Sequence, residues 1–472
     1  MKLTHVAASA LMAGLFFNAA PAMAQANPAA NPVDEAAALR EQVRILEARL
    51  DALERRLTES TSPQAIAAAT AAAGITPAAA PAPVVASAPT TKIEWKGAPR
   101  FVEGDKAFKV KGRIQADAGY VSAPGSLDDR GLGFNSEMRR IRLGGEGQLG
   151  AGFGYKLELE LSDNNVDLVD TFVTYEKGGW LIRLGNHNGF QSLDELTGDT
   201  TGSVMERAAF TDAFNFERRL GLSAQYSKGP LLAQAGVFTD DIGSLANSND
   251  GVNGGDENNS YSIDGRLIYA PKLGDTQLHF GASAHWRRLG RLEDASTRYR
   301  QRPFLHTTNT RLIGTPGMNV DNELNYGVEF AAISGPWHAA AEYHALRASR
   351  VGLSSVQFSG AYAELGYFLT KDDTRAYKEG QFAGGKPAHP MGKDGMGSVQ
   401  INLRYDYLDL DSKDIRGGQQ NAAIAALIWS PIQNLRFNIN YAWLMYDGAT
   451  ALPSGDQDYD AQVLGTRFEL DF

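Results

Sequence analysis

The sequence predicts an all-β transmembrane barrel of about 16 antiparallel strands, with an N-terminal helical coiled-coil segment. Three observations predict this fold. The chain begins with an export signal, a heptad repeat follows near the mature N-terminus, and from about residue 108 apolar and polar side chains alternate with a period of two. Many of the alternating runs reach ten to fourteen residues. Such runs are longer than usual globular strands and suit a tilted membrane crossing.

Composition narrows the classes of function. The chain has 472 residues, and no apolar run of about 18 residues occurs after its N-terminal segment. This excludes a helical membrane protein. A mean hydropathy of −0.29 does not exclude membrane strands, because they alternate apolar and polar faces. The chain has no cysteine, so thiolate metal sites and cysteine nucleophiles are absent, and its net charge of −10 disfavours nucleic acid as a partner. We expect no catalytic residue, no metal and no cofactor.

Residues 1–24 read as a secretory signal peptide. Lys2 gives a basic start, residues 6–17 form an apolar stretch, and Ala22-Met23-Ala24 supplies the small-x-small cleavage pattern, so that Gln25 begins the mature chain. The apolar stretch is too short for a membrane anchor.

Residues 34–59 repeat apolar side chains in steps of four and three, which is the seam of a coiled coil. The seam residues are Leu39, Val43, Leu46, Leu50, Leu53 and Leu57. About three heptads are marginal alone in water, so we expect partner chains to bury the seam. The alternative is a single amphipathic helix that lies on its own barrel. Residues 60–91, rich in Ala and Pro, then form an extended linker.

Residues 92–472 are expected to form the barrel. Short connections such as Lys177-Gly178-Gly179 nearly alternate with long ones at 188–218, 240–258 and 291–321, as in outer-membrane barrels. The connection 371–397 is long where a short turn is due, so it holds either a further hairpin or an extended turn. Alternation predicts sixteen strands, at 108–121, 137–149, 153–163, 168–177, 179–187, 219–228, 230–239, 259–271, 276–290, 322–334, 336–349, 355–370, 398–411, 420–431, 434–447 and 461–472.

Several segments of this region follow one another in a specific order. They include Glu137-Met138-Arg139-Arg140-Ile141-Arg142-Leu143, Ser192-Leu193-Asp194-Glu195-Leu196, Met205-Glu206-Arg207, Arg218-Arg219-Leu220-Gly221 and Gly366-Tyr367-Phe368-Leu369-Thr370. This ordered set resembles the phosphate-selective porin O/P family, an outer-membrane porin family, and the resemblance spans roughly residues 92–472. It implies a sixteen-stranded trimeric barrel, a third extracellular loop folded into the lumen, and rows of arginine that guide anions.

Arginine is the expected anion-binding residue, because its guanidinium stays charged and matches phosphate oxygens. The same strand register also turns many acids inward, so cross-strand pairs that hold the wall are the alternative interpretation. Clusters of arginine are the better candidates: Arg139-Arg140 with Arg142, Arg218-Arg219, and Arg287-Arg288 with Arg291. The candidate pore-lining and anion-binding residues are Arg113, Arg140, Arg142, Arg183, Arg207, Arg218, Arg219, Arg266, Arg287 and Arg404.

The loop 188–218 departs from what phosphate selectivity leads one to expect. Before Arg218 it carries one cation, Arg207, and no lysine. Its acids are Asp194, Glu195, Asp199, Glu206 and Asp212. An acidic constriction opposite a basic wall would set a transverse field instead.

The sequence therefore predicts passive diffusion of small solutes, in particular anions such as phosphate or polyphosphate, across the outer membrane of a Gram-negative bacterium. The expected partners are outer-membrane lipid, two further copies of the chain, small anions, and peptidoglycan through the coiled coil. A general or cation-preferring porin that tethers the cell wall through the coiled coil is the alternative. A barrel enzyme is disfavoured, since no Ser/His pair has a supporting register.

Overall fold

The computed structural model describes residues 91–95, 97–162, 164–240, 242, 260–289 and 297–472, together with Arg44, Ala48 and Arg49. The chain divides into two compact units, Met1–Ala86 and Ser87–Phe472. Arg44, Ala48 and Arg49 are helical and lie within the predicted coiled coil. The rest of that segment, the predicted signal peptide and nearly all of the predicted linker lie outside the described residues. No described helix is long and apolar enough to cross a membrane.

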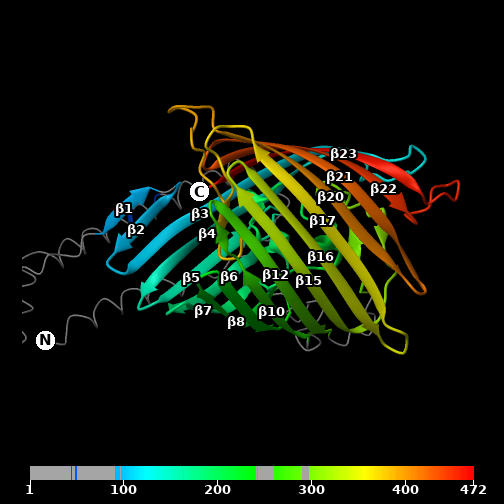
Figure 1. The fold of residues 1–472 in the computed structure, drawn as a ribbon, viewed down its shortest axis with the longest axis horizontal. Coiled ribbons are helices and arrows are strands. Elements are labelled where there is room, and N and C mark those ends of the chain that lie inside the picture. Colours follow the sequence, from blue (N-terminus) through cyan, green and yellow to red (C-terminus); the bar gives the residue numbers. More distant parts are fainter. Residues whose placement is uncertain are drawn as a thin grey trace, which may run out of the picture. The chain divides into compact units, whose positions relative to one another are not determined.

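Sixteen antiparallel strands of the described residues form a closed barrel (Figure 1). Each strand pairs with the next, and β23 pairs with β3 from Gln462↔Ser122 to Asp471↔Arg113, which closes the sheet. A closed barrel leaves no edge strand in the wall. The barrel strands are β3 (Lys106–Ser122), β4 (Gly133–Gly150), β5 (Phe153–Glu160), β6 (Asp167–Lys177), β7 (Trp180–Asn188), β8 (Arg218–Lys228), β9 (Leu231–Phe238), β10 (Tyr261–Tyr269), β12 (Thr276–Arg288), β15 (Val320–Ser334), β16 (Trp337–Arg350), β17 (Val356–Phe368), β20 (Ser398–Ser412), β21 (Ile415–Ile432), β22 (Leu435–Asp447) and β23 (Tyr459–Asp471). All sixteen predicted strands overlap these.

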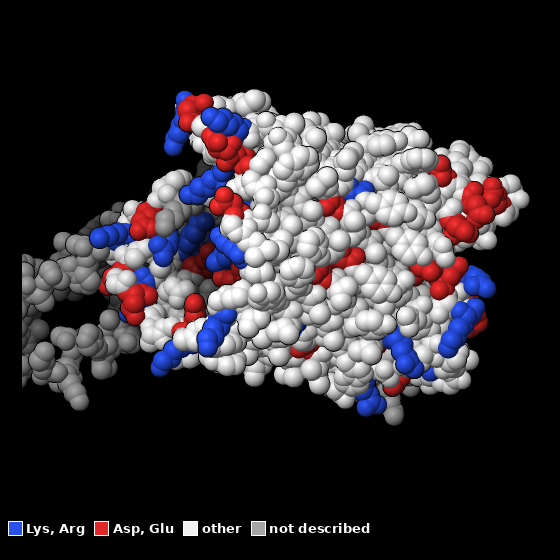
Figure 2. Space-filling view, in the orientation of Figure 1, with Lys and Arg blue, Asp and Glu red and all other residues white. Residues whose placement is uncertain are grey.

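Burial alternates along the barrel strands because successive side chains point to opposite faces. In β20 the lumen-facing Arg404 and Asp406 are buried, while the outward Leu403 is 60% exposed and Tyr405 is 52% exposed. The outer wall in Figure 2 is mostly uncharged between its two ends, where Lys, Arg, Asp and Glu gather. An apolar belt between charged ends is the surface that a bilayer requires.

Short turns join the strands at one end of the barrel, which is also the end where the chain terminates (Figure 1). There a small hairpin, β1 (Lys92–Trp95) and β2 (Pro99–Glu103), extends the sheet by pairing with the start of β3. The two-residue strand β11 (Lys272–Leu273) widens one of these turns. The opposite end carries the long loops, which include the pair β13 (Arg300–Gln301) and β14 (Ile313–Gly314).

The connection 369–397 is an extended turn that also contains a hairpin. Its strands β18 (Ala376–Lys378) and β19 (Gln381–Ala383) pair with each other and not with the wall. Tyr377 hydrogen-bonds the lumen-facing His279 at 2.6 Å, and Arg266 of β10 donates to the carbonyl of Gly380 at 2.8 Å. This short-turn-side hairpin therefore folds into the barrel.

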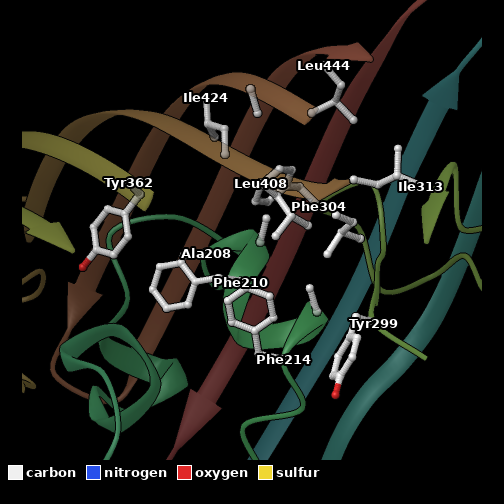
Figure 3. Packing of buried hydrophobic residues seen from close by; sticks show 14 of the residues in the cluster. Ala208, Phe210, Phe214, Tyr299, Phe304, Ile313, Tyr362, Leu408, Ile424 and Leu444 are labelled. Atoms are coloured by element: carbon white, nitrogen blue, oxygen red, sulfur yellow. The ribbon is translucent and has the colours of Figure 1, made fainter. Parts of the chain in front are cut away.

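The loop between β7 and β8, residues 189–217, also folds into the barrel, as expected. We call it the inner loop. It contains α4 (Leu193–Leu196), the 3-10 helix Asp199–Thr201 and α5 (Ala209–Ala213). Phe210 and Phe214 of the inner loop lie among Tyr362, Leu408 and Tyr299 in the hydrophobic cluster shown in Figure 3. One sector of the wall, around β17 to β22, is thus covered from inside.

Candidate functional site

Carboxylates of the wall hold the backbone of the inner loop. Glu342 of β16 accepts from the amides of Leu193 and Asp194 at 2.9 and 2.7 Å. Asp406 of β20 accepts from the amide of Ala209, and Asp264 of β10 from the amide of Phe190. Hydrogen bonds to a charged acceptor are roughly twice as strong as neutral ones. These buried acids fix the loop against the β10–β20 side of the barrel.

Two wall arginines complete the attachment of the inner loop. Arg404 of β20 binds Asp194 at 2.8 Å and Glu364 of β17 at 2.6 Å. Arg467 of β23 binds Glu206 at 2.6 Å and donates to the carbonyl of Met205 at 2.7 Å. The loop is therefore held on both sides of the lumen, and solute must pass through the space that it leaves.

A cavity of about 300 Å³ lies between the inner loop, β4 and the loop around residues 301–306. Six arginines and six acids line it, so its wall is close to electrically balanced. The charged lining residues are Arg139, Arg140, Arg207, Arg218, Arg302, Arg467, Asp194, Glu195, Asp199, Glu206, Asp212 and Glu217.

Asp199 is the acid that meets the arginine row of the opposite wall. Its carboxylate pairs with Nε of Arg140 at 3.0 Å and also with Arg113. Burial alone would raise the pKa of the Asp199 carboxyl, but the charges of Arg140 and Arg113 hold that pKa well below its ordinary value of 3.8. Asp199 therefore stays ionised and offsets one of the two arginine charges between the inner loop and strands β3 and β4.

Arg139 enters the same cavity because of a β-bulge in β4. Gln115 pairs with Arg140 and Ala116 pairs with Met138, so Arg139 is an extra residue between two ladder pairs. Met138 faces outward and is 45% exposed, whereas Arg139 and Arg140 both line the cavity. Strict alternation would have turned Arg139 to the lipid. No salt bridge from Arg139 to another described residue is present.

Eight of the ten predicted arginines are in salt bridges with described acids, and two are not. Arg183 and Arg219 have no such bridge; Arg183 lies over the ring of Phe172, with 4.8 Å between its guanidinium carbon and the ring centroid. For the other eight the structure favours the wall-holding interpretation over free anion-binding groups. Their pairs are Arg113–Asp199, Arg140–Asp199, Arg142 with Glu158 and Glu160, Arg207–Glu195, Arg218–Asp170, Arg266–Glu329, Arg287–Asp240, and Arg404 with Asp194 and Glu364.

Three of these ten do not face an open lumen. The Arg266 side chain is fully buried between Glu329 and the hairpin 376–383, and Arg219 and Arg404 are 5% and 3% exposed. The doublet Arg287-Arg288 is also divided: Arg287 binds Asp240 inside, while Arg288 is exposed on the outward face. Adjacent residues of a regular strand point to opposite faces, so Arg287 and Arg288 cannot both bind the same anion in the lumen.

A second cavity, of about 130 Å³, lies on the short-turn side of the inner loop. Arg375 from the extended turn and Arg436 from β22 line it, and they donate to the carbonyls of Thr201 and Gly202. Arg375 was not among the predicted residues, because a turn has no strand period that assigns it a face. Arg375 stands between Thr374 and Ala376, so it was not one of the arginine doublets either.

Comparison with known proteins gives the family. A family model described as phosphate-selective porin O and P matches residues 108–472. A Caulobacter vibrioides protein described as uncharacterized is 58% identical over 462 residues, which cover 96% of this chain and 93% of that protein.

Solved porin structures are similar at low identity. An anion-selective porin from Comamonas acidovorans is 13% identical with a TM-score of 0.48, over 78% of this chain and all of that chain. OprB of Pseudomonas putida is 10% identical with a TM-score of 0.48, over 78% of this chain and 94% of that chain. On the family match and the sixteen-stranded barrel, the chain belongs to the phosphate-selective porin O and P family and is an outer-membrane channel of Gram-negative type.

Proposed function

We propose that this channel passes small anions, inorganic phosphate among them, in modest preference to cations. The observation that carries the proposal is Arg139, which the β-bulge turns into the 300 Å³ cavity. Arg139 makes no salt bridge with a described acid, and the acids near it, Glu206 and Asp117, are already bound to Arg467. Five of the six acids that line this cavity are in salt bridges. The sixth, Glu217, lies near Arg219.

A single arginine without a salt bridge matters because charge acts locally in a hydrated pore. At physiological ionic strength the Debye length is about 8 Å, so a permeating ion responds to groups within that distance. The chain's net charge of −10 includes acids far from the cavity. Arg183, further along the lumen and also without a salt bridge to a described acid, adds to the same preference on the short-turn side.

The proposed preference is modest rather than phosphate-specific. The inner loop contains no lysine, and its arginine, Arg207, is bound to Glu195 at 3.3 Å and to the carbonyls of Asp194 and Glu195. A tight phosphate site would need several unshared donors around one anion. Phosphate should therefore pass as one anion among others and should block chloride current only weakly.

We further propose that the functional unit is a trimer joined by a three-stranded coiled coil at residues 34–59, on the periplasmic side. The a/d seam from Leu39 to Leu57 supports this, because one chain would leave it exposed. An association of this stalk with peptidoglycan is part of the same proposal.

Planar-bilayer recording tests the anion preference. The zero-current potential in a KCl gradient should show chloride preference, and Arg139→Gln should move it toward potassium. The matched control is the charge-neutral pair Arg142→Gln with Glu160→Gln, which removes a 2.7 Å salt bridge and should leave selectivity nearly unchanged. A wild-type pore that prefers potassium would contradict the proposal and favour the general or cation-preferring channel.

A further inference from the structure

Two arginines lie on the outward face of the barrel, where they cannot contribute to the lumen. Arg288 is the last residue of β12, and its neighbour Arg287 binds Asp240 inside the barrel. Arg347 of β16 alternates with the buried Leu346 and Ala348. Both arginines are exposed, and neither makes a salt bridge or hydrogen bond with another described residue.

The sheet register brings the two arginines close together. On the intervening strand β15, Arg288 is opposite Asn322 and Arg347 is opposite Leu324. Two strand spacings and a two-residue offset place their Cα atoms roughly 12 Å apart. Extended side chains from both positions can therefore reach one group between them. Asp321, next to Asn322, accepts a hydrogen bond from the Asn322 side chain at 2.9 Å.

Aromatic side chains fix the depth of this pair relative to the membrane. Tyr261 is the cross-strand partner of Arg288, and its ring lies 5.6 Å from that of Trp286, two residues below Arg288 on β12. Tyr326 and Tyr343 on β15 and β16 are each more than 40% exposed. Exposed aromatic residues mark the level of lipid headgroups. The two arginines lie at the outer edge of that level, at the long-loop end of the barrel, so they face the headgroups of the outer leaflet.

The wall below the arginines can accommodate an apolar chain. Ala284, Gly265 and Ala235 are paired neighbours on β12, β10 and β9, and all carry little or no side chain. A Cβ placed on Gly265 would meet no atom closer than 3.9 Å. Ile263 and Leu267 border this shallow strip and are 55% and 60% exposed. A charged group above an open apolar strip fits a lipid better than a free ion.

The rim at β22 and β23 has the opposite charge. At the same end of β22 and β23 the outward positions are Asp447 and Asp460, both exposed. Figure 2 likewise shows basic side chains near the ends of β15 and β16 and acidic ones near the ends of β22 and β23. An anionic headgroup is therefore attracted to the β12–β16 sector and repelled by the β22–β23 sector.

We propose that Arg288 and Arg347 bind the phosphate group of a phosphorylated lipid in the outer leaflet. Guanidinium forks bind phosphate oxygens bidentately, and two of them on one wall give a site for a single phosphate. The site is separate from the channel, because both side chains point away from the lumen.

Native mass spectrometry of the purified full chain tests the proposal, with diphosphorylated lipid A as the probe. The variant Arg288→Gln with Arg347→Gln should bind it at least about tenfold more weakly. Lys228→Gln with Lys272→Gln is the matched control, since it removes two exposed charges at the short-turn end and should bind like the wild type.

Two further measurements separate the lipid from other ligands and from the channel. Dephosphorylated lipid A should bind wild type and double variant equally, and inorganic phosphate at equal concentration should not displace the phosphorylated lipid. The zero-current potential of the double variant should match the wild type, whether or not the pore prefers anions. Equal binding of the phosphorylated probe by both proteins, or its displacement by inorganic phosphate, would overturn the lipid site.

Discussion

Replacing Asp199 by asparagine should make the channel more anion-selective. Its carboxylate is the acid that faces Arg113 and Arg140 across the narrow part of the lumen. Asparagine has nearly the same shape and keeps an oxygen that can accept from the amide of Thr200, as Asp199 does at 3.1 Å. The substitution therefore removes one negative charge and leaves the local geometry largely intact.

The size of the effect follows from Coulomb's law. A unit charge about 8 Å from a permeating ion changes its energy by about 0.5 kcal/mol in water, and by more near a protein surface. The change has opposite sign for chloride and potassium, so their energies separate by about 1 kcal/mol. Since about 1.4 kcal/mol corresponds to a tenfold ratio, the chloride-to-potassium permeability ratio should rise about fivefold.

The assay is the zero-current potential across a planar bilayer in a KCl gradient, recorded for the wild type and for Asp199→Asn. Asp275→Asn is the control, because Asp275 is exposed in the turn before β12 and carries the same charge. Adding Arg113→Gln to Asp199→Asn should return the selectivity toward the wild-type value. The electrostatic reasoning fails if Asp199→Asn raises conductance but leaves the potential where it was, which would indicate a displaced loop.

Three further predictions concern the lumen and the assembly. Removing the hairpin Ala376–Ala383 or residues 196–212 should raise single-channel conductance, several-fold for the latter, because both segments occupy the barrel interior. Burial raises the pKa of Glu195 above its ordinary value of 4.5 despite Arg207. Acidification should therefore protonate Glu195 before Asp199 and increase chloride preference, and Glu195→Gln should remove that dependence. Deleting residues 25–90 should leave a folded, conducting barrel, while cross-links introduced at residues 39–57 should join three full-length chains.

The strands were predictable because alternation is a local property. A barrel wall needs apolar residues on every second position, so sixteen runs in the sequence became sixteen strands, with ends that differ by a few residues. The hairpin at 376–383 was not assigned, since its three-residue strands are too short to show a period. In the sequence, the connection that contains this hairpin was recognisable only because it is long where a short turn between strands is expected.

The arginine site was less predictable because ion pairs form between elements that are distant in the chain. Arg113 meets Asp199 across 86 positions, and Arg404 meets Asp194 across 210. No local pattern connects such partners. The bulge at Arg139 leaves a weak signal in the sequence, namely two adjacent arginines in a membrane strand. Either one of them is exposed to lipid or the pairing of the strand is irregular at that point.

The inward acids that seemed to oppose an anion channel have a structural use instead. Glu342 accepts two amides of the inner loop and the hydroxyl of Tyr362, and Asp406 accepts a third amide. A hydrogen bond to a charged group contributes about 1.5–3 kcal/mol, so these carboxylates stabilise the loop that narrows the lumen. Their charge lies behind the loop, on the covered side of the barrel, while Arg139 lies on the open side. In the proposed mechanism, selectivity therefore depends on which side of the inner loop a charge occupies, and the total charge of the chain does not determine it.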